Sequence, residues 1–179
     1  MTSTLLDKIK WKGTIALAPI EINKLTTDSI NRILNNHGYQ IYDWLHITIL
    51  QFSRQENVAI INEQLPSIAS SFHPFYVDLV KLSSFMDKHV IYLELANTQE
   101  LNRLRNIIIS HCTPHMLASD TFSIPNTPHI SVAYVNKRDY AEIANSTAEL
   151  HVQESILLES IALRDWISMN RVFKFKQKA

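Results

Sequence analysis

Hydrophobic and polar positions alternate in several short segments of the chain, and between these segments apolar residues recur every three or four positions. Strict alternation is typical of a half-buried strand, and the longer spacing is typical of a helix with one buried face. The pattern predicts strands over residues 13–20, 39–52, 75–82, 89–95, 128–135, 155–164 and 171–176. It predicts helices over residues 27–37, 56–71, 98–111 and 138–147.

Residues that favour helix ends mark some of these boundaries. Thr26 or Thr27 can cap the first helix through a side-chain oxygen, and Gly38 follows its last turn, where glycine is favoured. Pro66 lacks the backbone N–H that a helix interior uses, so we expect the second helix to be interrupted or restarted there.

The predicted elements follow the order β-α-β-α-β-β-α-β-α-β-β, which is close to one unit used twice. Each half contains a strand with a histidine followed two residues later by a hydroxyl residue. We therefore expect an α+β fold with a single domain over residues 1–179, built from two intimately packed, pseudo-symmetric lobes of antiparallel sheet. The helices are expected outside, with a central active-site cleft between the lobes.

The two histidine strands carry the candidate chemistry. Side chains two residues apart in a strand share a face, so His46 lies beside Thr48, and His129 lies beside Ser131. One imidazole can take a proton from an attacking oxygen while the other gives a proton to the leaving oxygen. The two hydroxyls can donate hydrogen bonds to the oxygens of a phosphate.

A third triplet, His111-Cys112-Thr113, shows that the pattern alone arises by chance. It lies at the end of a predicted helix, where residues two apart point in directions about 200° apart, so we set it aside. His111 and His115 with Cys112 between them suggest a zinc site, but no clear third ligand accompanies them. The sequence predicts no metal and no cofactor.

Composition limits the ligand. Seventeen Lys and Arg residues balance 17 Asp and Glu residues, which disfavours a protein that coats long nucleic acid. A short nucleotide or an RNA end, with one or two phosphates, remains a suitable partner. Only two glycines occur in the chain, which excludes glycine-rich phosphate loops, so side chains must bind the phosphate.

The remaining composition favours a soluble cytoplasmic protein without a membrane partner. A single cysteine, Cys112, makes no internal disulfide, and the first residues lack the charge and apolar run of a signal peptide. No apolar run approaches the roughly 18 residues of a membrane span. We expect the protein to be a monomer.

The flanks of the two triplets resemble a known family. WLHITILQF (residues 44–52) and TPHISVAYV (residues 127–135) are similar to the two signature strands of the 2H phosphoesterase superfamily, about 80 residues apart. That superfamily includes bacterial 2′-5′ RNA ligase enzymes, plant cyclic phosphodiesterases and enzymes that cleave 2′,5′-oligoadenylate. The first strand, the helix capped at Asn97 or Thr98 and the ending IALRDW also fit, so the resemblance covers most of the chain.

The resemblance implies specific roles. It implies that His46 and His129 are catalytic and that Thr48 and Ser131 bind phosphate. The family commonly continues the first triplet with Phe-Leu-Gly or a similar sequence, whereas this chain has Gln-Phe-Ser at residues 51–53.

Four further residues are candidates for substrate binding. Phe52 shares the face of His46 in a regular strand and can stack on a base, whereas Tyr134 reaches that face only if a bulge intervenes. Arg164, in the penultimate predicted strand, is a candidate cation for the phosphate. Trp11 precedes the first strand, a region from which family members often line the groove.

The predicted function is metal-independent hydrolysis of a 2′,3′-cyclic phosphate or a 2′-5′-linked nucleotide or RNA end. The two histidines serve as acid and base, and the sequence leaves open which is which. One alternative is a phosphodiesterase that degrades cyclic oligonucleotide signals. Others are a non-catalytic module that binds nucleotides or RNA ends, and RNA end-joining by the reverse reaction.

Overall fold

The computed structural model describes residues 12–115, 122–165 and 170–177. The strands are β1 (Gly13–Leu17), β2 (Ile47–Phe52), β3 (Phe75–Phe85), β4 (Val90–Ala96), β5 (Phe122–Ser123), β6 (His129–Tyr134), β7 (His151–Leu158), β8 (Ser160–Asp165) and β9 (Asn170–Lys174). The helices are α1 (Lys24–Asn35), α2 (Asn57–Ser70), α3 (Gln99–Cys112) and α4 (Lys137–Ala148), with a 3₁₀ turn at Thr113–His115.

Within these residues, nine strands form one curved sheet in the order β7-β3-β4-β6-β2-β1-β8-β9, with β5 paired to the end of β2. All the described strand pairs are antiparallel. Strands β2 and β6 meet at the middle of the sheet and divide it into two lobes. Lobe A contains β1, β2, β5, β8 and β9, and lobe B contains β3, β4, β6 and β7. The α+β fold with two antiparallel lobes agrees with the prediction.

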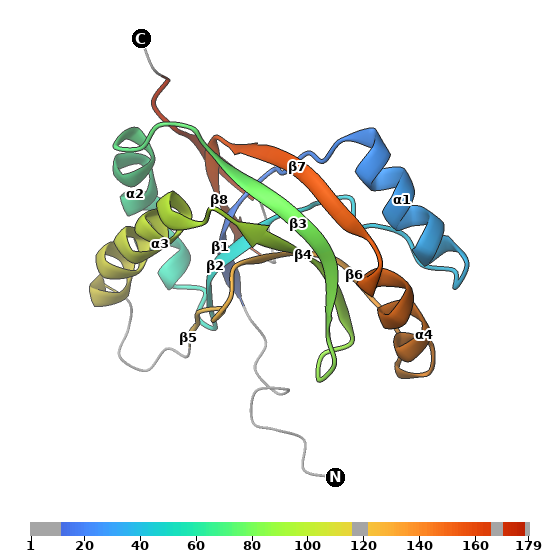
Figure 1. The fold of residues 1–179 in the computed structure, drawn as a ribbon. Helices are drawn as coiled ribbons and strands as arrows, with labels where there is room; N and C mark the ends of the chain where they lie inside the picture. Colours follow the sequence, from blue (N-terminus) through green and yellow to red (C-terminus); the bar gives the residue numbers. More distant parts are fainter. Residues whose placement is uncertain (1–11, 116–121, 166–169, 178–179) are drawn as a thin grey trace.

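The helices pack in pairs, one pair on each lobe (Figure 1). Helices α2 and α3 contact each other and the strands of lobe A, whereas α1 and α4 contact each other and α4 packs on β3 of lobe B. The buried side chains of α1 include Ile30 and Leu34, and those of α3 include Leu101, Leu104 and Ile108. This spacing of three or four residues gives each helix one apolar face against the sheet. No helix in the described part of the chain is long and apolar enough to cross a membrane.

Most strand bounds differ from the prediction by a few residues, and two predicted strands differ more. The single strand expected over residues 155–164 is two strands in the structure, β7 and β8. Glu159 lies between them and belongs to neither strand. The Ser160 hydroxyl donates to the Ala18 carbonyl at 2.7 Å, which ties the start of β8 to the end of β1. The run over residues 39–52 is a strand only from Ile47, because its first part crosses as a loop in which the Tyr42 amide donates to the Val132 carbonyl.

Helix boundaries also differ in part from the prediction. The cap of α1 is Asn23, whose Oδ1 accepts from the Thr26 amide at 2.8 Å, and Thr26 instead donates its hydroxyl to Glu154. Gly38 takes a positive φ of 77° just after this helix, in line with its predicted role. Helix α2 runs through Pro66 without interruption, so the predicted break is wrong.

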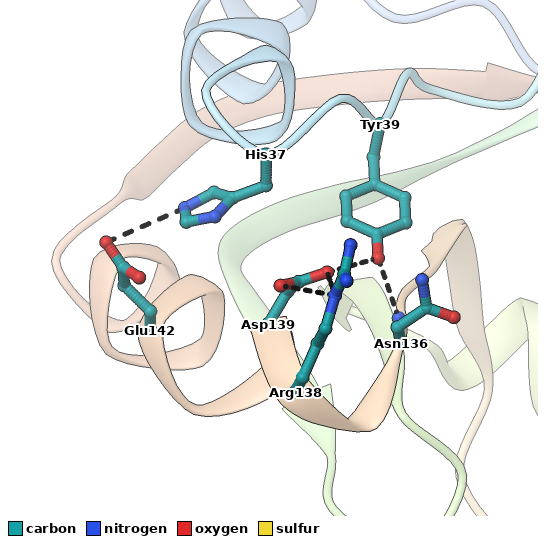
Figure 2. A network of polar contacts seen from close by, with 6 residues as sticks. All are labelled: His37, Tyr39, Asn136, Arg138, Asp139 and Glu142. Carbon is teal, nitrogen blue, oxygen red and sulfur yellow. Dashed lines mark hydrogen bonds and ion pairs between the residues drawn. The ribbon is translucent and has the colours of Figure 1, made fainter.

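A polar network joins the loop before β2 to the start of α4 (Figure 2). The Tyr39 hydroxyl donates to Asp139 Oδ2 at 2.7 Å and accepts from the Asn136 amide at 2.9 Å. His37 Nε2 lies 4.0 Å from Glu142 Oε1 across the same interface. Since one side of this network leads into β2 and the other follows β6, it holds together the two segments that carry the histidine triplets.

Candidate active site

The two histidine triplets meet where β2 pairs with β6. Ile47 lies opposite Ile130 in this antiparallel pair, and both side chains are completely buried. The neighbours of a paired residue point to the other face of the sheet. His46, Thr48, His129 and Ser131 therefore share the face away from the core. Antiparallel pairing places His46 opposite Ser131 and Thr48 opposite His129.

This face opens into a cavity of about 740 Å³ that draws its lining from both lobes. The four triplet side chains line the cavity. Aromatic and charged side chains surround them: Tyr42, Trp44, Phe85, Tyr134, the cations Lys88 and Arg164, and the carboxylates Asp43 and Asp87.

Both imidazole rings are held in the same way. His46 Nδ1 lies 3.2 Å from the carbonyl oxygen of Trp44, and His129 Nδ1 lies 2.8 Å from the carbonyl oxygen of Thr127. A carbonyl oxygen only accepts hydrogen bonds, so Nδ1 carries the proton in each ring. Nε2 is then the nitrogen that can exchange a proton with a ligand.

Burial and nearby charges lower the pKa of both histidines below the usual value of 6.5. For His46 the largest cause is desolvation, followed among the lowering causes by the charge of Arg164 and by His129; its hydrogen bond to Trp44 opposes the shift. For His129 desolvation again comes first, and Lys88 lowers its pKa further. Each imidazole is therefore biased toward its neutral form.

A layered stack covers His46. The Trp44 ring lies 4.2 Å from the His46 ring in a stacked arrangement, and the Arg164 guanidinium lies 4.8 Å from the centre of the Trp44 ring. The aromatic ring fixes the imidazole plane, and the cation over the ring adds positive potential beside it.

His129 has a comparable setting with different geometry. Phe85 and Tyr92 stack on each other at 4.0 Å, and the His129 ring meets them edge-on, at 4.9 Å and 5.3 Å. Lys88 Nζ lies 6.0 Å from the centre of the Phe85 ring. Each histidine thus has an aromatic support and a cation beyond it, one set from each lobe.

A β-bulge in β2 changes the face of the residues after Thr48. Leu50 lies opposite Ile15 and Thr48 lies opposite Ala16, which leaves Ile49 without a partner on β1. Two residues of one strand then oppose one residue of the other, and the alternation reverses. Ile49 and Leu50 are both completely buried as a result.

The bulge brings Gln51, and not Phe52, to the cavity. Phe52 is completely buried, and its ring packs so closely on Gly13 that it occupies the space where a Cβ of residue 13 would lie. The prediction that Phe52 faces the cleft is therefore wrong, because it assumed an unbroken repeat of two after Thr48.

Strand β6 contains a matching bulge after its own triplet. Ser131 and Ala133 oppose consecutive residues of β4, so Val132 between them has no partner on that strand. Val132 and Ala133 are buried, and Tyr134 turns to the cavity with 62% of its surface exposed. Tyr134 and Gln51 both come five residues after a histidine, so they occupy equivalent places in the two lobes.

Tyr42 contacts Tyr134 at the edge of the cavity. Their ring centres lie 5.8 Å apart with the planes tilted by 43°. Burial is the main cause that raises the pKa of Tyr42 to about 12, so its hydroxyl stays protonated at neutral pH and can act as a donor.

Of the other predicted residues, Arg164 lines the cavity and Trp11 lies outside the described residues. Sequence reasoning missed Tyr42, Trp44, Gln51 and Lys88 as cavity residues. Trp44 has a recognisable signal, since it lies two residues before His46. Lys88 comes from the turn between β3 and β4, and no local pattern links that turn to the histidines.

The third triplet lies apart from the cavity. His111 Nδ1 is hydrogen-bonded to the Ile107 carbonyl, and the Thr113 hydroxyl donates to the Ile109 carbonyl. Both hydrogen bonds lie within α3 or at its C-terminal end. Cys112 is buried in the core, where desolvation raises its pKa to about 11. In the described part of the chain no three His, Cys, Asp or Glu side chains group together as metal ligands would.

Comparison with known proteins identifies one family. The profile described as the 2′-5′ RNA ligase superfamily matches residues 21–166. A search of curated protein sequences finds no significant match.

Solved structures share the fold at low sequence identity. TT0787 of Thermus thermophilus gives a TM-score of 0.62 at 13% identity, over 94% of this chain and 100% of that one. E. coli LigT in its apo form gives 0.57 at 14% identity, over 94% and 98%. Kluyveromyces marxianus Usb1 gives 0.54 at 13% identity, over 91% and 97%. Other LigT structures contain 3′-AMP, ATP or phosphate.

Proposed function

Because this chain belongs to the 2′-5′ RNA ligase superfamily of 2H phosphoesterases, we propose that it hydrolyses a 2′,3′-cyclic phosphate or a 2′-5′-linked nucleotide or RNA end. In this proposal His46 and His129 are the acid and base, and no metal takes part. The observation that carries it is the matched pair of imidazoles on one face of β2 and β6, each with Nδ1 bonded to a carbonyl.

The proposed reaction on a cyclic phosphate uses both Nε2 atoms. Nε2 of one histidine takes a proton from water as the water oxygen bonds to phosphorus. The bond from phosphorus to a ribose oxygen breaks, and Nε2 of the other histidine gives its proton to that oxygen. Proton exchange with solvent then restores both rings. On a 2′-5′ linkage the neighbouring 3′-hydroxyl gives its proton to one Nε2 and bonds to phosphorus, and the 5′-oxygen leaves with a proton from the other Nε2. The 2′,3′-cyclic phosphate formed is then hydrolysed by water as above.

The hydroxyls and cations stabilise the phosphate in this reaction. Thr48 and Ser131 alternate with the histidines across the strand pair, so each can donate to a non-bridging oxygen of a phosphate centred between them. Arg164 and Lys88 add positive potential from opposite lobes. An anionic phosphate between the two rings favours protonation of one imidazole, which offsets its lowered pKa.

A nucleotide substrate also suits the remaining lining. Tyr42 and Tyr134 offer aromatic surface at one edge of the cavity, on which a base can stack. LigT, which has the same fold, holds 3′-AMP and ATP in its structures. A cyclic oligonucleotide, which also presents phosphodiester bonds to the two imidazoles, is the second candidate substrate.

The test is turnover of a substrate panel in excess EDTA. The panel contains 2′,3′-cyclic nucleotides, 2′-5′ oligoadenylate and cyclic dinucleotides. We expect hydrolysis of at least one of the first two classes at an unchanged rate in EDTA. Loss of all activity in EDTA would overturn the metal-free mechanism. Binding without turnover across the panel would favour the non-catalytic module.

A further inference from the structure

A row of polar side chains crosses lobe A beside the triplets. Gln51 of β2 lies directly opposite Thr14 of β1 on one side and Ser123 of β5 on the other. Side chains directly opposite each other in antiparallel strands lie on one face, with Cβ atoms about 5 Å apart. All three residues line the cavity. They lie in one line across three strands, and together they carry two hydroxyls and one amide.

Thr14 gives this row a second, independent feature. This residue is only 2% exposed, and its hydroxyl oxygen has no hydrogen-bond partner among the residues that the structure describes. A buried polar atom without a partner is rare and unfavourable in a folded protein. Thr14 lines the cavity directly opposite Gln51, so its hydroxyl belongs to the same polar row.

The row and the tyrosine pair lie on opposite sides of the phosphate position. Along β2, Gln51 follows Thr48 and so lies beyond the end of the site that holds His129. Because β6 runs the other way, Tyr134 lies beyond the end that holds His46. The cavity is therefore aromatic on one side of the phosphate and neutral but hydrogen-bonding on the other.

We propose that Thr14, Gln51 and Ser123 form a subsite for the hydrogen-bonding edge of a second nucleobase. The substrate is then a phosphodiester between two nucleosides, with one base at Tyr42 and Tyr134 and the other at this row. This inference rests on the proposed phosphodiesterase function and specifies its substrate. An amide and hydroxyls offer both donors and acceptors, as a base edge requires, and Gln pairs well with adenine.

The charges of the cavity favour a base over a second phosphate in this row. The row itself is neutral. The Arg164 backbone lies opposite Thr14, but its guanidinium extends over Trp44, beside His46. Lys88 lies over Phe85 in lobe B. Both cations are therefore placed to interact with the central phosphate, and the row is suited to bind a neutral group.

The test compares two substrates that differ by one nucleoside. One is 2′-5′-linked diadenosine monophosphate, and the other is adenosine 2′,3′-cyclic phosphate. We expect Gln51→Ala to lower kcat/KM on the dinucleoside about tenfold or more and to change the cyclic mononucleotide less than twofold. Gln51→Met retains a similar length, adds no charge and cannot donate a hydrogen bond, so it should show the same selective loss. Gln99→Ala, on the exposed start of α3, should change neither substrate.

Binding provides a second readout that does not depend on turnover. In a His46→Ala/His129→Ala background the uncut dinucleoside is titrated by calorimetry, with and without Gln51→Ala. Weaker dinucleoside binding with Gln51→Ala supports the subsite even if the wild type turns over neither substrate, in which case only the proposed function fails. Equal effects on both substrates, or no effect on either, overturn the subsite. Adenosine 3′,5′-bisphosphate is titrated in the same way. If Gln51→Ala weakens the binding of this ligand alone, the subsite is also overturned, because a phosphate would then occupy the row.

Discussion

Ile47 of β2 lies directly opposite Ile130 of β6, and neither side chain has any exposed surface. This buried pair fixes the register at which the two lobes meet. A slip of either strand by one residue would turn its isoleucine to the cavity and its histidine to the core. The chemical pair of imidazoles is thus aligned by an apolar pair on the opposite face of the sheet.

The first prediction concerns the two histidines. We expect His46→Ala and His129→Ala each to lower kcat on a cleaved phosphodiester by about 10²- to 10⁴-fold, because each ring serves as acid or base. The double variant should lose little more than the worse single variant, since the two rings act as a unit. Steady-state rates with circular dichroism as a folding control test this. Wild-type turnover in both single variants would rule out the assignment.

The pH profile of kcat/KM should reach its maximum below pH 6.5. The base must be neutral, so activity falls as the pH drops through its pKa, and the acid must be protonated, so activity falls as the pH rises through its pKa. Burial lowers the pKa of both His46 and His129, which moves both limbs to lower pH. Rates measured from pH 4 to pH 9 in buffers of constant ionic strength would show this, and a maximum well above pH 7 would contradict it.

Two charge variants can identify the acid and the base. Arg164→Ala removes a cause that lowers the pKa of His46, and Lys88→Ala removes a cause that lowers the pKa of His129. We expect each variant to move one limb of the pH profile to higher pH, and we expect the two variants to move different limbs. If Arg164→Ala moves the acidic limb, His46 is the base. Arg164→Lys keeps the charge and should leave that limb in place. Movement of the same limb by both variants would contradict separate roles.

Gly13 should be intolerant of a side chain because of Phe52. The two residues are direct partners across β1 and β2, and the Phe52 ring fills the space of a Gly13 Cβ. We expect Gly13→Ala to destabilise the fold by about 1–3 kcal/mol through overpacking. Urea unfolding should show a smaller loss from Gly13→Ala when Phe52→Leu is already present. Strict additivity of the two changes would argue against the contact.

The Tyr39 hydroxyl should stabilise the fold in a pH-dependent way. Tyr39→Phe leaves the Asn136 amide without this acceptor, which costs about 1 kcal/mol. The Tyr39 hydrogen bond is also the main cause that lowers the pKa of Asp139. A lowered carboxyl pKa stabilises the fold above the unfolded value and loses that effect as the pH falls through the folded value.

Urea unfolding at pH 7 and at pH 3 tests this, with Tyr76→Phe on the exposed surface of β3 as the control. The loss caused by Tyr39→Phe should be larger at pH 7 than at pH 3. An equal loss at both pH values would show that Asp139 takes no part in the effect.

The histidine strands were predictable because alternation is a local property. His46, Thr48, His129 and Ser131 follow strict alternation, and the structure places all four on one face of the sheet. The flanking aliphatic residues marked the buried face in the same way. The α+β class and the two lobes followed from the order of the elements.

The two bulges were not predicted, because a bulge is defined only relative to a partner strand. Alternation does break just before Gln51, where Ile49 and Leu50 are consecutive apolar residues, but only the register with β1 shows that Ile49 is the extra residue. The error on Phe52 has this cause. The break at Glu159 and the loop before Ile47 likewise depend on contacts with distant strands, such as the bond from Ser160 to Ala18.

The paired bulges also bear on how enzymes of this architecture diverge. Each bulge sends two residues into the core and then turns one to the cavity, so positions 51 and 134 line the cavity outside the buried packing. We expect a mutation at either position to leave the two histidines and the apolar register in place. Substrate preference could then change independently in each lobe without a change at the proposed acid and base.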